Sequence, residues 1–393
     1  MKNVLIFTSD LYQGGVAEST RKISKILEDD FNVSICTYDS LPIEKEISKN
    51  INIISMNLPL SVGFRNTTFT RNAVKVLRYL CLPLAFLKLL LIVYKIKPNV
   101  VYSMTYVPNI INVLVSKVFN FKCIISERQD PREDLVSGSI LSKVLKKLYP
   151  LADVIHVNSY EMIEAVCEYY SVSQKKIFRF DNFFFRNELL ELSNHSVNDD
   201  LFNEVNGSKC YKIITSGRLS KQKGQWHLVP IISRILEKNV NVSLFILGEG
   251  ELRQELEGLI GEYSLQNNIF LLGNVHNPHK YVSRCDLFIF PSIWESFGNT
   301  LVEAMGVGIP VVSTVCRSGP RQIINEGQFG ISIGELPKYG FHLEDERIDE
   351  ISNTIISLLT FGKAEASEKS IEGFHRFDAN CVKPLIHKLF REN

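Results

Sequence analysis

The sequence CDLFIFPSIWESFGNTLVEAMGVGIPVV, residues 285–312, decides the fold class of this chain. Its apolar runs predict one strand over residues 287–290 and another over residues 309–312. A helix is predicted between them, beginning near Asn299 and ending before Gly306. A strand, a loop, a helix and a strand in so short a stretch are typical of a parallel α/β sheet, in which ligands bind at the carboxyl ends of strands.

The loop before this helix has the features of a phosphate-binding site. Gly298 lets a ligand approach the backbone because it has no Cβ. The first amides of a helix have no intrahelical partner and can donate hydrogen bonds to a phosphate. We expect the donor-binding groups here to come from Ser296, Phe297, Gly298, Asn299 and Thr300.

Two carboxylates accompany this loop. Glu295 lies in the loop and Glu303 lies eight residues later, about one turn into the helix, so both can face one pocket. Carboxylates beside an anion site suit the hydroxyl groups of a sugar nucleotide. In the alternative interpretation, Glu295 is solvated and Glu303 caps its own helix.

A basic loop follows the apolar run that begins at Tyr211. Gly217 and Arg218 stand at the end of that predicted strand, and Lys223 follows five residues after Arg218. These two cations can converge on one diphosphate, since Arg binds two oxygens and Lys acts as a point charge. A lysine this close to another lysine is also common on any protein surface, so the loop alone does not decide the matter.

Two further residues end predicted strands of the same half. Glu249 comes after the apolar run that starts at Val242, and His276 ends the run that starts at Ile269. Both are expected to border a nucleotide, although Glu249 could equally cap the helix that follows it.

The first half of the chain has two polar loops after predicted strands. Gly14 and Gly15 follow a strand over residues 3–8 and precede a helical pattern, which is either a phosphate-approach loop or a plain strand-to-helix turn. Glu127 and Arg128 follow a strand over residues 121–125. They either serve the acceptor or form an internal salt bridge. The lone His156 in an apolar strand is predicted to be a core residue.

Together these segments resemble the retaining glycosyltransferases of family four, which have the GT-B fold. The stretch from Glu295 to Glu303 is similar to the E-x7-E signature of that family, and the segment Gly-Arg-Leu…Lys-Gly at residues 217–224 is similar to another of its motifs. Residues 317–321 resemble the Ser-Gly-Pro-Arg turn of hexosamine-type members. The resemblance covers nearly the whole chain and is strongest over residues 211–325.

This resemblance implies an α/β architecture of two Rossmann-like, doubly wound domains that face each other across a cleft. The amino-terminal domain, which binds the acceptor, is expected at residues 1–190. A polar segment over residues 187–208 is predicted to link it to the nucleotide-sugar domain at residues 205–375. A helix at residues 376–393 is expected to pack back on the first domain.

The resemblance also implies a reaction. A hexose or N-acetylhexosamine would move from a UDP-sugar to a lipid-linked or polysaccharide acceptor, as in O-antigen, capsule or lipid-linked oligosaccharide synthesis. Arg218 and Lys223 would stabilise the departing diphosphate, Glu295 would hold the donor sugar and Glu303 the ribose. No DxD metal motif follows a strand, so neither a metal ion nor another cofactor is expected.

The first half of the chain matches the family at one loop and departs from it at another. By the resemblance, Gly14 and Gly15 would lie beside the donor diphosphate or the acceptor. Many members have a His near the position of Glu127, but none stands there in this chain. The pattern Ser-Glu-Arg-x-Asp-Pro resembles instead a subset that transfers hexosamine or related sugars, in which Arg128 would bind a phosphate and Glu127 would accept a proton.

Charge and cysteine content narrow the class of partner. The 393 residues carry a net charge of only +1, which excludes a general nucleic-acid binder. The balance is uneven, because residues 1–190 contain 24 Lys and Arg against 18 Asp and Glu. The eight cysteines include no CxxC pair, which is typical of reduced thiols in a cytoplasmic protein.

The most hydrophobic stretch lies within residues 71–97. Its apolar run is shorter than the about 20 residues of a membrane span and is interrupted by Pro83 and Lys88, so a span is rejected. It is either a helix buried against the sheet or a helix whose outer face enters anionic lipid. Two groups of cations favour peripheral contact with an anionic membrane at the inner face of the plasma membrane. The first group flanks this stretch and consists of Arg71, Lys75, Arg78, Lys95 and Lys97, and the second consists of Lys143, Lys146 and Lys147.

Two other functions remain open at this stage. A protein of the same fold could bind a sugar nucleotide or a membrane without turnover, as a scaffold. A phosphorylase-like enzyme would need a pyridoxal-phosphate lysine and a longer chain. The joint presence of Arg218, Lys223, Glu295 and Glu303 favours the glycosyltransferase.

Overall fold

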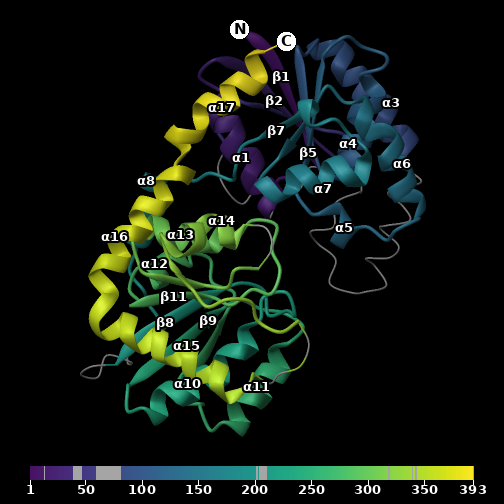
Figure 1. The fold of residues 1–393 in the computed structure, drawn as a ribbon. Coiled ribbons are helices and arrows are strands. Elements are labelled where there is room, and N and C mark those ends of the chain that lie inside the picture. The colour runs from purple at the N-terminus through teal and green to yellow at the C-terminus, as the bar shows by residue number, and fades with distance from the viewer. Residues whose placement is uncertain are drawn as a thin grey trace. The chain divides into compact units, whose positions relative to one another are not determined.

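A computed structural model describes most of the chain, and it divides into two compact units (Figure 1). The first unit comprises residues 1–182 and 382–393, and the second comprises residues 183–381. The boundary thus falls eight residues before the predicted residue 190, and the returning carboxyl-terminal segment starts at Val382 instead of residue 376. The described residues are 1–12, 14–38, 47–58, 81–200, 202, 210–316, 319–338, 340 and 343–392.

The first unit is built on a seven-stranded parallel sheet with the order β3-β2-β1-β4-β5-β6-β7. The strand order reverses between β1 and β4, as in a doubly wound Rossmann-like sheet. Such strands read as continuous apolar runs because helices cover both faces of the sheet. The strands are β1 (Lys2–Phe7), β2 (Phe31–Thr37), β3 (Asn52–Ser55), β4 (Val100–Met104), β5 (Lys122–Glu127), β6 (Val154–Val157) and β7 (Ile177–Arg179).

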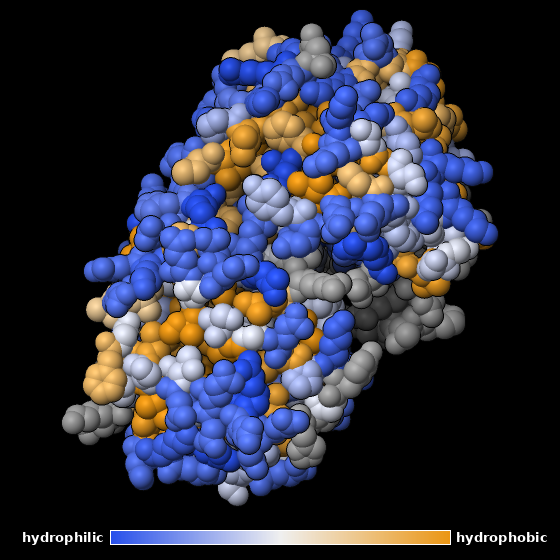
Figure 2. All heavy atoms as spheres, in the orientation of Figure 1, coloured by the Kyte–Doolittle hydropathy of each residue, from blue (hydrophilic) through white to orange (hydrophobic). Residues whose placement is uncertain are grey.

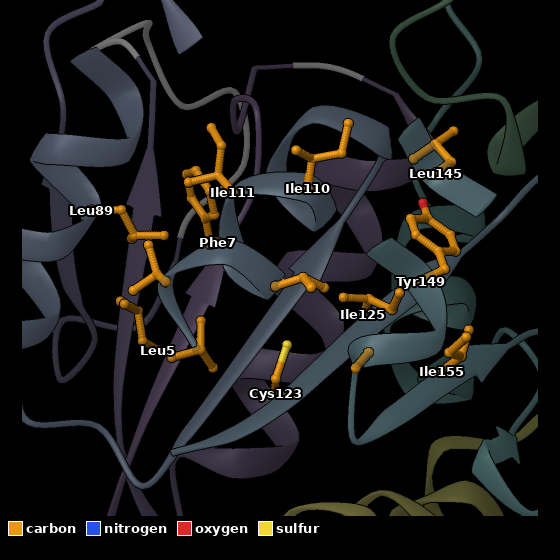
Figure 3. Packing of buried hydrophobic residues seen from close by; sticks show 14 of the residues in the cluster. Leu5, Phe7, Leu89, Ile110, Ile111, Cys123, Ile125, Leu145, Tyr149 and Ile155 are labelled. Carbon is orange, nitrogen blue, oxygen red and sulfur yellow. The ribbon is translucent and has the colours of Figure 1, made fainter. Parts of the chain in front are cut away.

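One face of this sheet forms the main core of the first unit. Side chains from β1, β5 and β6 point toward those of the covering helices in Figure 3, where Leu5, Ile125 and Leu89 are fully buried. Alternate residues of a strand point to opposite faces. In β4, Val101 belongs to this core, so its neighbour Tyr102 points to the other face, where its ring lies 5.5 Å from that of Phe390. The helices are α1 (Gly15–Leu27), α3 (Leu82–Ile96), α4 (Tyr106–Val115), α5 (Pro131–Asp134), α6 (Ile140–Leu148), α7 (Tyr160–Tyr170) and α17 (Ala379–Arg391).

The carboxyl-terminal segment is tied to the first unit by polar contacts. Lys122 donates to the carbonyl oxygen of Leu389 at 2.8 Å, and Nε2 of His387 donates to the carbonyl oxygen of Ile26, in the last turn of α1, at 3.3 Å. Since a carbonyl oxygen only accepts, Nε2 of His387 carries the proton. Residues from opposite ends of the chain therefore complete one domain.

The second unit contains a six-stranded parallel sheet with the order β10-β9-β8-β11-β12-β13. Both of its faces are buried: Ile213 and Ile289 belong to one apolar cluster, whereas Ile214 and Phe288 belong to another. This alternation makes the second sheet doubly wound as well, which confirms the predicted fold class. The strands are β8 (Tyr211–Ser216), β9 (Val242–Leu247), β10 (Ile269–Gly273), β11 (Leu287–Phe290), β12 (Val311–Ser313) and β13 (Ile331–Ser332).

Helices cover the two faces of the second sheet in separate groups. Helices α10 and α15 pack together on one face, and α13 packs with α8 and α16 on the other. The helices are α8 (Arg186–Ser193), α10 (Leu228–Glu237), α11 (Arg253–Glu262), α12 (His279–Val282), α13 (Asn299–Val307), α14 (Pro320–Ile324), α15 (Asp345–Ser357) and α16 (Lys363–Phe374).

The helix α13 differs from its prediction at its end. It continues through Gly306 and stops at Val307, and Gly308 with φ +86° forms its left-handed cap. Gly306 is inside the helix for a packing reason. A Cβ at this position would lie 2.7 Å from atoms of both Leu189 and Phe374, so only glycine allows α8 and α16 to approach this closely.

The segment predicted as a linker is ordered structure in its first part. Helix α8 begins at Arg186, and Leu189 is only 6% exposed in the apolar cluster of the second unit. The sequence did not predict this helix, because its other residues are mostly polar and a single buried leucine gives a weak periodic signal.

Helix α3 is the described part of the hydrophobic stretch that was expected within residues 71–97. It is 15 residues long, with Pro83 in its first turn. No helix among the described residues has both the length and the apolar character needed to cross a membrane. The cations Arg71, Lys75 and Arg78 lie outside the described residues.

We predict that Gly306→Ala destabilises the protein by roughly 1–3 kcal/mol, although alanine favours helices, because the new methyl group meets Leu189 and Phe374. Gly258→Ala is the matched control: it lies within α11, and a Cβ there meets no atom within 4 Å. The control should stabilise by about 0.5–1 kcal/mol. Urea unfolding of both variants measures this, and equal effects of the two substitutions would contradict the packing argument.

Candidate functional site

The carboxyl ends of β8 and β11 bring together two of the predicted catalytic residues. These strands are parallel neighbours, so the loops that follow them start at the same edge of the sheet. Lys223 in the first loop forms an ion pair with Glu295 in the second. Glu295 also accepts a hydrogen bond from the hydroxyl group of Ser292 at 3.0 Å, and its side chain is only 8% exposed. The interpretation of Glu295 as a solvated residue is therefore wrong.

Glycines let the two loops approach through their backbones. The stem of Lys223 lies over Gly217, where a Cβ would be 3.3 Å from its Cδ and Cε atoms. Gly224 has φ +64°, and a Cβ there would lie 2.4 Å from the carbonyl oxygen of Pro291. The Lys-Gly pair thus has two roles: Lys223 supplies a positive charge, and Gly224, the next residue, allows the close contact with the loop after β11 that any side chain would block.

Arg218 is exposed at the tip of the same loop. Its side chain makes no hydrogen bond or ion pair within the described ranges. Gln225 holds the loop in place, because its Nε2 donates to the carbonyl oxygens of Gly217 at 3.3 Å and Arg218 at 3.1 Å. Gln225 and Ser292 were not predicted to contribute, since nothing in their local sequence separates such an amide or hydroxyl from any other.

The amino terminus of α13 lies at this edge as well. Gly298 caps it with φ +113° and, as a glycine, has no side chain to accept a capping hydrogen bond. The hydroxyl group of Thr300 donates to the carbonyl oxygen of Ser216 at 3.3 Å, which ties the first turn of α13 to the end of β8. The site therefore combines a helix start with two cations, a suitable environment for a diphosphate.

Glu303 and the turn before α14 complete this part of the second unit. Glu303 is half-buried, does not cap α13, and has no hydrogen-bond or ion-pair partner in the part of the chain that the structure describes. Gly319 has φ +75°, and a Cβ there would lie 1.7 Å from the carbonyl oxygen of Phe297, so this turn lies directly against the loop before α13. Arg317 and Ser318, which precede it, lie outside the described residues.

Glu249 and His276 are placed differently from each other. Glu249 forms an ion pair with Arg253 of α11, four residues later, so it is engaged with that helix. Its backbone is close to the basic loop, since its carbonyl oxygen accepts from the amide of Leu219 at 3.0 Å. His276 is exposed three residues after β10 ends, and no contact joins it to the basic loop among the described residues.

In the first unit, Gly14 and Gly15 begin helix α1. Both are exposed, and a Cβ at either position would meet no atom within 4 Å. Gly14 has φ +98° and caps the helix without a side-chain hydrogen bond. The amino terminus of α1 thus lies after β1, beside the point where the sheet order reverses.

Glu127, the last residue of β5, is almost completely buried at 3% exposure. Its carboxylate accepts from the hydroxyl group of Tyr170 at 3.1 Å and from the amide of Arg128 at 3.0 Å. Burial raises the pKa of the Glu127 carboxyl to about 7, because two hydrogen bonds only partly replace the lost water.

Arg128 points its guanidinium group away from Glu127. Its Nη1 donates to the amide oxygen of Asn182 at 2.5 Å, and its Nε is buried without a hydrogen-bond partner. Within the described ranges it forms no ion pair, so the alternative of a Glu127–Arg128 salt bridge is wrong. A buried, unsatisfied donor on a charged group is costly and is a feature that a ligand could relieve.

His156 is a core residue, as predicted. Its Nε2 lies 3.1 Å from the carbonyl oxygen of Phe180, which can only accept, so this nitrogen is the donor. Its Nδ1 then accepts from the hydroxyl groups of Tyr102 at 2.9 Å and Ser126 at 3.0 Å. Burial keeps the pKa of His156 well below its usual value, so the ring is neutral.

No cluster of three or more His, Cys, Asp or Glu side chains among the described residues could hold a metal ion.

Comparison with known proteins places this geometry in a family. Residues 198–372 match the model of the glycosyl transferases group 1. An N-acetylgalactosamine-N,N'-diacetylbacillosaminyl-diphospho-undecaprenol 4-alpha-N-acetylgalactosaminyltransferase of Campylobacter jejuni is 30% identical over 264 residues, which cover 66% of this chain and 69% of that protein. The chain belongs to the group 1 glycosyl transferases.

Other similar proteins agree with this assignment. An uncharacterized glycosyltransferase of Methanocaldococcus jannaschii is 35% identical over 248 residues, and the match spans 60% of each protein. Among solved structures, HepE of Anabaena in complex with UDP has a TM-score of 0.73 at 18% identity, with both chains covered completely. WaaG, a glycosyltransferase of lipopolysaccharide biosynthesis, has a TM-score of 0.66 at 14% identity over 99% of this chain and 98% of that chain. The fold of this group 1 glycosyl transferase is thus GT-B.

The family match does not cover all candidate residues equally. It contains every one from Gly217 to Glu303, whereas Gly14, Gly15, Glu127 and Arg128 lie outside it. The candidate residues of the first unit therefore depend on their own geometry within this group 1 glycosyl transferase.

We predict that Glu127 makes stability depend on pH. Its pKa is raised from 4.5 to about 7 in the folded state, so its stabilising effect is complete below about pH 4.5 and is lost as the pH rises through about 7. Relative to Glu127→Gln, which cannot ionise, the wild-type free energy of unfolding should fall by roughly 2–3 kcal/mol between about pH 5 and about pH 8. Urea unfolding of both proteins across this range is the measurement, and parallel curves would show that Glu127 is not perturbed.

Proposed function

We propose that this chain is a retaining glycosyltransferase that moves a hexose or N-acetylhexosamine from a UDP-sugar to a lipid-linked or polysaccharide acceptor without a metal ion. The observation that carries the proposal is the convergence of Lys223, Glu295 and the start of α13 at one edge of the second sheet. Such a site provides positive charge for a diphosphate and a carboxylate for a sugar.

The Lys223–Glu295 pair suggests how the donor would enter. While the site holds no donor, each charge neutralises the other, which limits the cost of holding Glu295 in a nearly buried position. A bound diphosphate would attract Lys223 and leave Glu295 free to accept hydrogen bonds from the donor sugar hydroxyls. The ion pair would thus be replaced by two contacts with the donor, one between Lys223 and the diphosphate and one between Glu295 and the sugar hydroxyls.

Arg218 and the α13 amides would supply the remaining positive charge. Arg218 is exposed and uses none of its donors on a described neighbour, so it can bind two phosphate oxygens. Charge that develops on the departing UDP would then be stabilised by Arg218, Lys223 and the helix start, which together replace a metal ion. Glu303, which also lacks a partner in the described ranges, would hold the ribose hydroxyls.

Other donor-side groups complete the proposal. In the second unit, the binding surface would include the glycines and loop residues that let the donor approach the backbone, with Glu249 and His276 at its border. In the first unit, Gly14 and Gly15 are the proposed donor-binding residues. Those of the second unit are Gly217, Ser296, Phe297, Gly298, Asn299 and Thr300.

Similarity to named proteins supports the donor and acceptor classes. HepE was crystallised with UDP, with UDP and glucose and with UDP-glucose, and TarM with UDP and alpha-GlcNAc-glycerol. The Campylobacter relative is named for transfer to a diphospho-undecaprenol glycan, and a Staphylococcus aureus relative for capsular polysaccharide synthesis. For this chain we infer a UDP-sugar and a membrane-anchored acceptor, used at the cytoplasmic face of the plasma membrane.

On the acceptor side, Arg128 and Glu127 are the proposed residues. The unsatisfied Nε of Arg128 would pair with an acceptor phosphate. Glu127 would take up the proton of the acceptor hydroxyl, for which a pKa near neutrality is suitable. Its burial requires that the acceptor, or a water molecule, reach it past the side chains of Tyr170 and Arg128.

We predict that Lys223→Ala and Arg218→Ala each lower kcat/KM for sugar transfer by about 100-fold or more, because each removes positive charge from the departing diphosphate. Lys221→Ala is the matched control, since Lys221 is an exposed lysine two residues before Lys223 and lies outside the site. Thermal unfolding checks that Lys223→Ala, which leaves Glu295 without its cation, remains folded. An active, folded Lys223→Ala enzyme would contradict the assignment.

The donor class is tested by a panel of UDP-sugars and GDP-sugars in binding and slow-hydrolysis assays. We expect one UDP-sugar to bind with micromolar affinity and to be hydrolysed by the wild-type enzyme. Binding without turnover, unchanged in Lys223→Ala, would indicate a non-catalytic protein. If no nucleotide sugar binds, the site assignment is wrong.

A further inference from the structure

The first unit contains a long segment without acidic residues. Residues 47–126 include ten Lys and Arg and no Asp or Glu, although the whole chain has 43 acidic residues for 44 basic ones. Residues 135–152 likewise contain three lysines and no acidic residue. Helices α3, α4 and α6 all come from these two segments; α4 has no charged residue, whereas α3 and α6 carry lysines that no acidic residue on the same helix offsets.

Helix α3 has two apolar faces, and only one is used by the fold. Ala85, Leu89 and Val93 are buried against the core of the first unit. The opposite face is exposed to between 46% and 65%, at a spacing of three and four residues that forms a single stripe along the helix. This stripe consists of Leu84, Leu87, Leu91 and Tyr94.

This stripe is unusual for the molecule. Large exposed side chains elsewhere are mostly single, as Phe361 and Trp294 are in the second unit, and single ones need no explanation. Four in register on one helix form a patch, and hydrophobic residues are visible over α3 in Figure 2. Leaving such a patch in water is unfavourable, which indicates that something covers it.

Exposed lysines lie at the end of α3 and on α6. Lys95 and Lys97 are exposed at the carboxyl-terminal end of α3, next to Tyr94. Helix α3 packs against α4, which packs against α6, and there Lys143 and Lys147 are exposed. The exposed Ile140 adds an apolar side chain at the start of α6.

We propose that the docking face, defined as the α3 stripe with Lys95, Lys97, Lys143 and Lys147, binds the surface of an anionic lipid bilayer. The apolar stripe would enter the boundary between headgroups and acyl chains while the lysines contact lipid phosphates. Tyr94 lies beside the lysines, as expected for an aromatic residue at the level of the headgroups. At 15 residues α3 is about 22 Å long, so it lies in the interface and does not cross the bilayer.

Charge separates this partner from the other candidates. In a two-fold dimer through the same face, the lysines of both copies would meet each other, which is unfavourable. A nucleic acid would satisfy the lysines but leave the leucine stripe in water. An anionic bilayer satisfies both, because it offers phosphates above an apolar interior.

This inference deepens the proposed function, because it places the unit with Glu127 and Arg128 on the surface that would hold a lipid-linked acceptor. It uses no property of the donor site, however. Binding to vesicles can therefore be measured without any nucleotide sugar, so the two proposals can fail separately.

The test is co-sedimentation of the full chain with vesicles of phosphatidylcholine alone or mixed with phosphatidylglycerol. We expect binding only to the mixed vesicles, weakened by salt. Leu87→Glu combined with Leu91→Glu should lower the bound fraction by at least about tenfold, because two carboxylates would enter the apolar boundary. Phe361→Glu is the matched control: its side chain is 92% exposed in the second unit, and it should bind as the wild type does.

A second variant tests the charges. Lys95→Gln combined with Lys143→Gln and Lys147→Gln should lose the preference for phosphatidylglycerol while keeping the stripe. Equal sedimentation of the wild type and the Leu87/Leu91 variant would overturn the proposal. It would also be overturned if light scattering without vesicles showed a dimer that the Leu87/Leu91 substitutions convert to a monomer, since a second copy would then cover the face.

Discussion

Parallel strand direction is the constraint on which this molecule depends. In each described sheet the paired strands all run in the same direction, so every strand ends at the same edge and must be followed by a loop there. Backbone groups in those loops cannot be paired within the sheet. They are paired between loops instead, as between Ile293 and Gln222 at 2.8 Å and between Leu219 and Glu249 at 3.0 Å. The candidate donor site is built from these connected loops.

Close approach of the loops explains why glycine recurs at this edge. At Gly224 and Gly248 a Cβ would collide with the carbonyl oxygens of Pro291 and Gly217, at 2.4 and 2.1 Å. Both residues also have positive φ, so any other residue would be strained as well as blocked. These glycines therefore allow the loops after β8, β9 and β11 to lie so close together that Lys223 and Glu295 form an ion pair. The backbone contacts at the glycines thus also position the charged groups of Lys223 and Glu295.

The two units use charge in different ways. In the second unit, the cation of Lys223 is balanced by Glu295 at the candidate site. In the first unit, Glu127 is buried with a raised pKa and Arg128 has a buried, unsatisfied nitrogen, so polar groups there are held at some cost. The outer helices α3 and α6 carry exposed lysines beside exposed leucines. Buried polar groups that are incompletely hydrogen-bonded, and exposed lysines beside apolar side chains, are both more typical of binding surfaces than of structural cores.

The sequence by itself determined the fold class and most of the second-unit candidate site. Apolar runs followed by glycine-rich polar loops predict parallel strands with a ligand edge, and Lys223 and Glu295 could be named because each lies in the loop after such a run. The carboxyl end of a parallel strand is a local property, so local pattern is sufficient to find it.

Tertiary structure alone decided the rest. Only packing shows that Gly306 belongs inside α13, that α8 is a helix where a linker was expected, and that Glu127 and Arg128 do not form a salt bridge. Nor does the sequence show that α3 buries one apolar face and exposes the other. Each of these depends on which residues distant in the chain approach within a few ångströms, because burial and pairing are properties of the assembled core and not of any one segment.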